Sequence, residues 1–354
     1  MEKELITGSE ALMRSLEREG VKTIFGYPGG AIMPVYDALY DHLDKINHIL
    51  VRHEQGAAHA AQGFARVSGK VGVCLVTSGP GATNTITGIA DAMIDSTPIV
   101  VIAGQVGTGL LGTDAFQEVD LVGITQPISK WSYQIRRAED VAWAVSRAFY
   151  IARSGRPGPV VLDFAKNAQV EKTAYTPVDV DFIRSYDPNP DVDMECIKAA
   201  ADCINAAKRP LVLVGQGVEL GNAQQELKSF LEKGDLPCGC TLLGLSAIAT
   251  DHPLNKGMLG MHGNLGPNVK TNECDVLIAV GMRFDDRVTG DLAAYARQAK
   301  VIHLDIDPSE FGKNVPVDIP VLGNCKTTLA LLTELMKENK HTEWIDSFAE
   351  HAQT

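Results

Sequence analysis

Short runs of consecutive apolar residues alternate with longer stretches of helical spacing through residues 1–165. The runs predicted as strands are residues 23–25, 46–51, 71–77, 99–103 and 160–164. Ahead of them, Thr7 to Glu10 fits a helix capping box and Gly20 fits a helix stop. The runs are continuous and do not alternate with polar residues, which is typical of strands covered by helices on both faces. Strands that alternate with helices predict an α/β domain with a doubly wound parallel sheet.

The same pattern returns after a segment rich in proline and aspartate. Residues 166–190 contain Pro177, Pro188 and Pro190 and show no clear period, as in a linker. Beyond it we expect a helix over 194–204, strands at 210–214, 275–281 and 301–305, and a helix at 327–337. The sequence therefore predicts two α/β domains, each with a doubly wound parallel sheet, over residues 1–165 and 191–340.

Composition and charge narrow the classes of function. The chain has 354 residues and a formal net charge of −12, which argues against a nucleic-acid backbone as partner. No apolar run approaches the ~20 residues that span a bilayer, and the start MEKELITGSE lacks the pattern of a secretory signal. Seven scattered cysteines without a CxxC pair argue against a disulfide scaffold or a zinc ribbon. We therefore expect a cytoplasmic protein with no membrane or nucleic-acid partner, in which local positive groups can still bind a small anion.

Three segments of the first domain follow predicted strands and carry candidate chemistry. Residues 26–30 (GYPGG) either let the backbone approach a ligand closely or form only a tight turn. In residues 52–66, Glu54 lies at a strand-to-helix junction, where a half-buried carboxylate can exchange a proton with a ligand nitrogen. The alternative is an acidic residue that interacts with a helix N-terminus. Residues 77–84 (TSGPGATN) lack the lysine of a P-loop, so they either cradle a phosphate without hydrolysis or form a pocket wall.

The second domain has comparable glycine-rich segments. Residues 215–221 (GQGVELG) follow a strand and are one residue longer than the dinucleotide fingerprint. Residues 257–263 (GMLGMHG) and 281–290 (GMRFDDRVTG) are dense in glycine and polar side chains. Arg283 and Arg287 can bind phosphate or carboxylate, or can form a structural network with the two aspartates between them.

No metal site is predicted from the histidines. Zinc needs at least three close ligands, and the histidine spacing does not provide them. The histidines that we interpret as structural are His53, His59, His252, His262 and His303.

Together these segments resemble one family, the catalytic subunit of acetohydroxyacid synthase (acetolactate synthase), a thiamine-diphosphate enzyme. The motifs that carry the resemblance are FGYPGG, RHEQGAAHAAQGFAR, TSGPGATN, GTDAFQE, SGRPGPV, GMLGMHG, GMRFDDRVTG and HLDIDPSEFGKN, in the family's order. The first two are shared by many thiamine-diphosphate decarboxylases, whereas GMLGMHG and RFDDRVTG point to the flavin-containing biosynthetic synthases. The resemblance implies a pyrimidine-binding domain followed by a central FAD-binding type of domain.

The resemblance also implies roles for individual residues. Glu54 resembles the family's glutamate that hydrogen-bonds N1′ of the cofactor's aminopyrimidine and so promotes loss of the C2 proton. The other positions implied to bind thiamine diphosphate are Tyr27, Pro28, Gly29, Thr77, Pro80 and Asn84. The implied substrate positions are Phe116, Gln117, Lys166 and Arg287, the last of which would bind the second ketoacid. The implied FAD positions are Arg156, Gly215, Gln216, Gly217, Thr241, Leu242, Leu243, Gly260, Met261, Gly281, Arg283, Asp285, Asp305, Ile306, Asp307 and Glu310.

The activity implied by the resemblance is decarboxylation of pyruvate and condensation with pyruvate or 2-oxobutyrate, in the biosynthesis of valine, leucine and isoleucine. A homodimer or tetramer with a small regulatory subunit would carry it out. The family holds the diphosphate and Mg²⁺ in a third domain through a GDG motif, which this sequence lacks. Residues 341–354 would then begin the linker to that domain. We expect this chain by itself to be inactive and its uptake of FAD to be weak or absent. The alternatives are another thiamine-diphosphate enzyme, such as glyoxylate carboligase or oxalyl-CoA decarboxylase, or a non-catalytic dimerising fragment.

Overall fold

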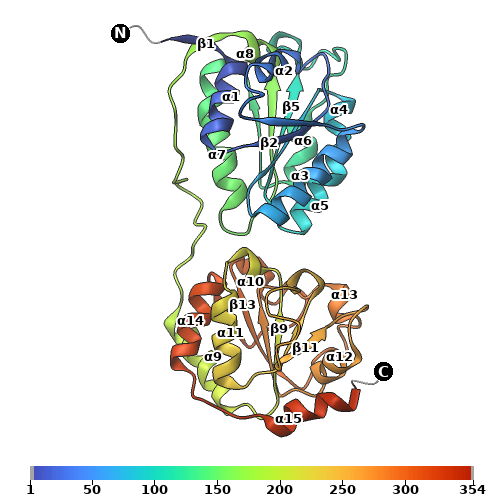
Figure 1. Cartoon of the computed structure of the whole chain (residues 1–354), viewed down its shortest axis with the longest axis vertical. Coiled ribbons are helices and arrows are strands. Elements are labelled where there is room, and N and C mark those ends of the chain that lie inside the picture. The colour runs from blue at the N-terminus through green and yellow to red at the C-terminus, as the bar shows by residue number, and fades with distance from the viewer. Residues whose placement is uncertain (1–3, 352–354) are drawn as a thin grey trace. The chain divides into compact units, whose positions relative to one another are not determined.

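The computed structural model describes residues 4–351, which form two units that meet in the sequence between Pro188 and Asn189 (Figure 1). Each unit contains one six-stranded sheet in which every pair of neighbouring strands is parallel. The predicted fold class, two α/β domains with parallel sheets, is confirmed.

The sheet of unit 1 has the strand order β3-β2-β4-β5-β7-β6. Its strands are β2 (Thr23–Gly26), β3 (Asn47–Leu50), β4 (Gly72–Val76), β5 (Ile99–Gln105), β6 (Trp131–Ile135) and β7 (Val160–Ala165). All of these except β6 were predicted. The edge strand β6, with sequence WSYQI, was missed because it is only partly buried and has no continuous apolar run.

Helices cover both faces of this sheet. The helices on one face are α1 (Gly8–Arg18), α2 (Met33–Tyr40) and α7 (Val141–Arg153), and those on the other are α3 (Glu54–Ser68), α5 (Ile86–Ile94) and α6 (Leu121–Thr125). Along β4, Val73 and Leu75 pack toward the first set, while Cys74 and Val76 pack toward the second. The continuous apolar runs of the sequence therefore serve two separate cores.

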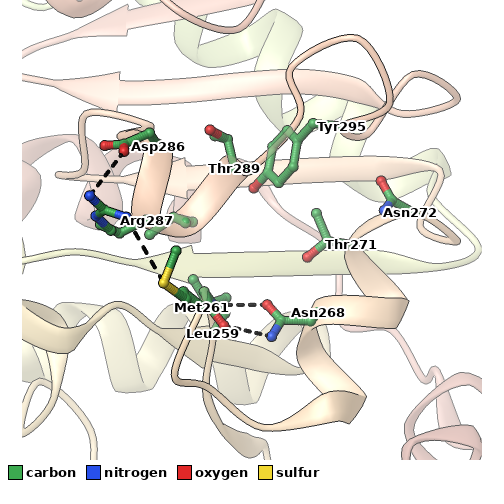
Figure 2. Close-up of a pocket in the computed structure, with 12 residues that line it drawn as sticks. Leu259, Met261, Asn268, Thr271, Asn272, Asp286, Arg287, Thr289 and Tyr295 are labelled. Carbon is green, nitrogen blue, oxygen red and sulfur yellow. Dashed lines mark hydrogen bonds and ion pairs between the residues drawn. The ribbon is translucent and has the colours of Figure 1, made fainter.

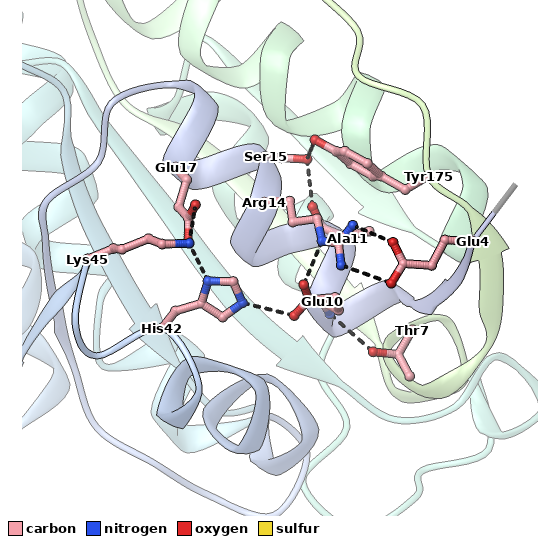
Figure 3. A network of polar contacts seen from close by, with 10 residues as sticks. All are labelled: Glu4, Thr7, Glu10, Ala11, Arg14, Ser15, Glu17, His42, Lys45 and Tyr175. Carbon is pink, nitrogen blue, oxygen red and sulfur yellow. Dashed lines mark hydrogen bonds and ion pairs between the residues drawn. The ribbon is translucent and has the colours of Figure 1, made fainter.

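A polar network joins α1 to the turn after α2 (Figure 3). The buried His42 faces the carboxylates of Glu10, at 2.9 Å, and Glu17. Arg14 binds Glu10 at 2.6 Å, and Lys45 binds Glu17 at 3.2 Å. Burial lowers the pKa of His42, but the hydrogen bonds to the two carboxylates outweigh it and raise that pKa overall.

The predicted capping box of α1 forms in part. Thr7 Oγ1 accepts a hydrogen bond from the backbone N–H of Glu10 at 3.1 Å, as predicted. The carboxylate of Glu10 binds Arg14 and His42, so this side chain is used for tertiary contacts. Gly20 has a φ of 76° just beyond the helix, as expected for a stop.

The sheet of unit 2 has the strand order β11-β10-β9-β12-β13-β14. Its strands are β9 (Pro210–Val214), β10 (Cys238–Cys240), β11 (Asn255–Met258), β12 (Val276–Val280), β13 (Lys300–Asp305) and β14 (Ile319–Leu322). The predicted strands β9, β12 and β13 form its buried centre. The other three were missed because they are short and carry glycine, cysteine, polar residues or proline.

Helices α9 (Met194–Ala206), α11 (Gln224–Gly234) and α14 (Cys325–Leu335) cover one face of this sheet, and α12 (Leu265–Thr271) and α15 (Thr342–Asp346) lie with the other. The predicted helices at 194–204 and 327–337 correspond to α9 and α14. The remaining helical elements are α4 (Pro80–Thr83), α8 (Lys166–Val170), α10 (Gly217–Leu220), α13 (Asp286–Thr289), η1 (Thr108–Leu110), η2 (Gln126–Ile128), η3 (Ala138–Asp140), η4 (Leu242–Gly244), η5 (Pro308–Glu310) and η6 (Ser347–His351).

The ends of the predicted linkers differ from the structure. Residues 166–174 form α8 and the strand β8 (Lys172–Ala174), which pairs antiparallel with β1 (Leu5–Thr7) in unit 1. In unit 2, Trp344 of α15 is buried, and its Nε1 donates to the carbonyl of Pro210 at 2.7 Å. Both segments are short, so their packing depends on partners far away in the sequence. Within residues 4–351, no helix is long and apolar enough to cross a membrane.

Candidate active site

In unit 1 the strand order reverses between β2 and β4, because the chain passes from β2 to β3 on one side and from β4 to β5 on the other. Ligands of doubly wound sheets bind in the crevice outside the carboxyl ends of strands at such a point. The two predicted segments that follow these strands meet there. The N–H of Tyr27 donates to the Leu75 carbonyl at 3.1 Å, and the N–H of Ala31 donates to Thr77 Oγ1 at 3.3 Å.

Glu54 lies beside this crevice as the first residue of α3. Its side chain is buried, and its Oε2 accepts a hydrogen bond from Asn84 Nδ2 at 2.9 Å. Its Oε1 lies beside Gly81, and within residues 4–351 it has no hydrogen-bond partner. Oε1 is not among the enclosed unpartnered atoms of the described residues, so it is accessible and suited to accept a hydrogen bond from a ligand N–H. Glu54 also lies in the first turn of α3, which agrees with the interaction with a helix N-terminus, while proton exchange with a ligand stays a prediction.

The predicted substrate residues of unit 1 lie at the same edge of the sheet. Lys166 follows β7, and its Nζ donates to the carbonyl of Gly30 at 3.3 Å. Phe116 and Gln117 lie on the loop after β5, where Phe116 is 87% exposed. The backbone of Gln117 packs against Gly79, where a Cβ would lie 2.6 Å from the Gln117 carbonyl oxygen. The structure thus brings together the segments predicted to bind cofactor and substrate, although their roles stay predictions.

In unit 2 the strand order also reverses at one point, between β9 and β12. In chain order the strands read 3-2-1-4-5-6, which is the order of dinucleotide-binding folds. Gly217 donates its N–H to the Gly281 carbonyl at 2.9 Å, and a Cβ on Gly217 would lie 2.6 Å from Gly281 Cα. A Cβ on Gly215 would overlap the same carbonyl. The glycines therefore form a backbone cradle at the switch point, which suits a phosphate-bearing ligand.

The residues predicted to bind FAD follow the carboxyl ends of successive strands of unit 2. Those after β9 are Gly215, Gln216 and Gly217; after β10, Thr241, Leu242 and Leu243; after β11, Gly260 and Met261; after β12, Gly281, Arg283 and Asp285; and at the end of β13 and beyond it, Asp305, Ile306, Asp307 and Glu310. Arg156 lies in unit 1, where its Nε donates to Ser96 Oγ at 2.8 Å. The unit 2 residues thus share one edge of the sheet, which fits an extended dinucleotide laid across it.

The two arginines of the RFDDRVTG segment differ in their contacts. Arg283 binds Asp285 at 3.1 Å, and Asp285 also accepts the N–H of Arg287 at the start of α13. The side chain of Arg287 is mostly exposed and lies 3.6 Å from Asp286 and 3.9 Å from the sulfur of Met261 (Figure 2). Arg283 therefore takes part in a structural network, while Arg287 offers its guanidinium to solvent or to a ligand.

A cavity of about 350 Å³ lies beside Arg287 and Met261 (Figure 2). Asn268 bonds both the N–H and the carbonyl of Gly260 at 2.8 Å and so fixes this wall. Tyr295 lines the cavity, and its buried hydroxyl has no hydrogen-bond partner among the described residues. Burial raises the pKa of Tyr295, so the phenol stays neutral and can donate a hydrogen bond.

The contacts of the histidines do not indicate a catalytic or metal-binding role. His53 Nδ1 accepts the N–H of Gln55 at the start of α3, and His59 lies 3.5 Å from Asp91. Burial lowers the pKa of His303, which hydrogen-bonds the Met282 carbonyl at 2.7 Å. Across residues 4–351, no three histidine, cysteine or acidic side chains are placed to hold a metal ion.

Several residues of these sites were not predicted from the sequence. Asn268 and Tyr295 carry no motif and reach the cavity only through tertiary packing. Asp163 had a usable signal, because it is a charged residue inside the apolar run 160–164. Gln105 ends the neighbouring strand β5 and contacts Asp163.

Comparisons with known proteins agree with this geometry. Residues 6–124 match the model of the N-terminal TPP binding domain of thiamine pyrophosphate enzymes, and residues 197–332 match the model of their central domain. The chain is 49% identical over 352 residues to the probable acetolactate synthase large subunit of Methanocaldococcus jannaschii, which covers 97% of this chain and 59% of that protein. It is 46% identical to the acetolactate synthase large subunit of Corynebacterium glutamicum and to the isozyme 3 large subunit of Escherichia coli, over 97% of this chain and 55% and 60% of theirs. The chain thus spans little more than half the length of these relatives. It belongs to the thiamine pyrophosphate enzyme family, and over nearly its whole length it is similar to acetolactate synthase large subunits.

Proposed function

We propose that this chain forms the pyrimidine-binding and central domains of an acetolactate synthase large subunit. The reaction is decarboxylation of pyruvate and joining of the two-carbon product to a second 2-ketoacid, pyruvate or 2-oxobutyrate. The observation that carries the proposal is Glu54, a buried residue at the switch point of unit 1. One carboxylate oxygen is held by Asn84, and the other has no partner among residues 4–351. The similarity to acetolactate synthase large subunits supports the choice within the family.

The residues of unit 1 fit the aminopyrimidine half of thiamine diphosphate. Tyr27, Pro28 and Gly29 would line one side of the ring, and Thr77 and Pro80 the other. Bound thiamine diphosphate supplies a carbon acid at C2 and stores the electrons released by decarboxylation. Glu54 would share a proton with ring nitrogen N1′, and Asn84 would hold the Glu54 carboxylate in the orientation that this requires.

Positive side chains would orient the ketoacids. Lys166 and Arg287 belong to different units, and each presents a cation at the carboxyl end of its own sheet. A guanidinium can bind a carboxylate through two parallel hydrogen bonds, so we assign the second ketoacid to Arg287. Phe116 and Gln117 would form the wall beside the first ketoacid.

The glycine cradle of unit 2 fits the diphosphate of FAD, and the cavity beside Met261 and Arg287 offers space for a flat ring system. FAD supplies no net redox change in the proposed reaction, so its role would be to organise this edge of unit 2. As the resemblance to the family implies, Mg²⁺ and the thiamine diphosphate tail would be held by residues outside these two domains.

The proposal is tested with the natural protein that contains this chain, assayed for acetolactate from pyruvate with thiamine diphosphate, Mg²⁺ and FAD. Glu54→Gln should slow exchange of the C2 proton by roughly 10²–10⁴-fold, the usual contribution of a positioned proton-transfer group. Glu195→Gln, the same substitution at an exposed position on α9, is the matched control and should change nothing. An unchanged rate of C2 exchange in Glu54→Gln would refute the assigned role.

A further inference from the structure

Asp163 is a fully buried carboxylate in the centre of unit 1 that the proposed chemistry does not use. It lies on β7 between β5 and β6. Its Oδ2 accepts hydrogen bonds from Gln134 Nε2 at 2.7 Å and from Gln105 Nε2 at 3.2 Å. Its Oδ1 has no partner among the described residues. Buried carboxylates with incomplete hydrogen bonding are rare, so this one calls for an explanation.

The carboxylate is charged at neutral pH despite its burial. Burial raises the pKa of Asp163 to about 6, although the two glutamine amides oppose this effect. The charged groups near it are Asp120, which raises this pKa further, and Arg136, which lowers it. A raised pKa means that ionisation of Asp163 costs folding stability above pH 6. The ionised form of Asp163 is therefore not explained by global stability.

Gln105 connects Asp163 to the loop that follows β5. The Gln105 Nε2 that bonds Asp163 also donates to the carbonyl of Val119 at 2.9 Å, and its Oε1 accepts the N–H of Val106 at 2.8 Å. Val106 and Val119 are the two ends of the loop. The Gln105 amide, which Asp163 orients, thus holds the two ends of the loop together.

Further contacts hold the loop together and set it against the site. Glu118 accepts the N–H groups of Gly112 and, at 3.1 Å, Ala115. Gln117 has a φ of 59°, an unusual conformation for a residue other than glycine, and its backbone packs on Gly79. Gly79 precedes α4, whose Gly81 lies beside the Glu54 carboxylate. The loop therefore reaches the wall of the proposed cofactor pocket.

We propose that Asp163 is a positioning residue: it orients the Gln105 amide, which holds loop 106–119 against the Gly79 turn and so places Phe116 and Gln117. The placement of the loop follows from the contacts alone. Only the consequence for ketoacid binding rests on the function proposed above.

The proposal predicts a pH dependence in the loop. Protonation of Asp163 removes the charge that both amides bond, and the new O–H has no acceptor among the described residues at Oδ1. Loop 106–119 should therefore lose order as the pH falls through about 6. The pKa of Glu118 is lowered by the backbone hydrogen bond from Gly112, so Glu118 stays charged over this range and does not produce the same transition.

Hydrogen-exchange mass spectrometry of this chain, followed over peptides that cover residues 106–119 between pH 5 and pH 8, tests the proposal without cofactor or substrate. Protection factors of the wild-type loop should fall with a midpoint near pH 6. Asp163→Asn should lower them roughly tenfold at pH 7.5, the value of about one charge-assisted hydrogen bond, and should abolish the pH dependence. Because ionisation no longer opposes folding, the same variant should keep or raise the overall unfolding midpoint at pH 7.5. If Asp163 had only a structural role, Asp163→Asn would lower both the protection factors of the loop and the unfolding midpoint.

Two further variants decide the case if Asp163→Asn fails to fold. Gln105→Met removes the clamp and should loosen the loop at every pH. Gln134→Met is the matched control, because it removes the other amide on Asp163 but no loop contact; it should keep the loop ordered at pH 7.5 and move the midpoint to higher pH. A wild-type loop that is insensitive to pH, or equal loop protection in Gln105→Met and Gln134→Met, would overturn the proposal. The two proposals can fail separately. A loop that shows no pH transition does not change the outcome expected for Glu54→Gln, and an unchanged C2 exchange rate in Glu54→Gln does not affect the loop measurement.

Discussion

The carboxyl edges of the two sheets make an instructive pair. Both sheets are parallel, and in both the strand order reverses beside glycine-rich loops. At the switch point of unit 1 the sequence places a buried carboxylate, Glu54, with one oxygen open. At that of unit 2 the glycines 215, 217 and 281 bring two backbone segments into close contact. In the function proposed above, the same architecture would serve two kinds of ligand group, a heterocycle that shares a proton in unit 1 and a phosphate that needs backbone approach in unit 2.

The strongest test of the backbone cradle in unit 2 is Gly215→Ala. The new Cβ would overlap the Gly281 carbonyl, and pairing between β9 and β12 keeps the two backbones from separating. We expect the free energy of unfolding to fall by about 1–3 kcal/mol and FAD binding by the natural protein to weaken roughly a hundredfold. Calorimetry and flavin titration measure the two effects. Unchanged flavin affinity would mean that the cradle does not hold the dinucleotide.

Asn84→Leu tests whether unit 1 depends on an oriented carboxylate. This change removes the only hydrogen bond that the Glu54 carboxylate receives within residues 4–351. Exchange of the cofactor C2 proton should slow about tenfold, and the free energy of unfolding should fall by about 1–3 kcal/mol, because a buried acceptor loses its partner. Asn47→Leu, on the exposed edge strand β3, is the control. A variant that loses stability but keeps the exchange rate would reduce Asn84 to a structural residue.

A third test uses the pH dependence of stability that His42 should give to unit 1. The folded pKa of His42 is raised, so its stabilising contribution is complete below the ordinary value and is lost as the pH rises through the folded pKa. Unit 1 should therefore lose stability as the pH rises above the ordinary histidine value, and His42→Gln should remove this slope.

Denaturation followed by the fluorescence of Trp131 and Trp143 in a Trp344→Phe background reports unit 1 alone. The Asp163 effect lies at lower pH, so the two can be told apart. A slope that persists in His42→Gln would assign the pH dependence to another group.

The smallest expected effect comes from Gly63→Ala in α3. A Cβ at this position meets no atom within 4 Å, in contrast to Gly215. Alanine should stabilise the helix by about 0.5–1 kcal/mol, which equilibrium denaturation can measure. Destabilisation would show that small size at position 63 is required in the folded chain, as it is in the cradle.

Central strands could be predicted from the sequence, whereas most edge strands and short strands could not. Strands β2, β4, β5, β7, β9, β12 and β13 were evident as apolar runs, because central parallel strands are buried on both faces. Strands β6, β10, β11 and β14 were missed, because edge or short strands carry polar residues, glycine or proline. The resemblance supplied the candidate residues. The structure showed that those of each unit lie at the carboxyl edge of its sheet, except Arg156, which precedes β7 at the opposite edge of the unit 1 sheet.

What the sequence by itself determined is local: which runs become strands, where α1 begins and ends, and which loops are rich in glycine, since these depend on neighbouring residues. Only the tertiary structure decided the strand order, the crevices at the two switch points, and the contacts of Asn84 with Glu54 and of Gln105 with Asp163. Those contacts join residues 30 and 58 positions apart. No local pattern specifies such pairs, because they depend on how strands and loops distant in the sequence come to lie side by side when the core packs.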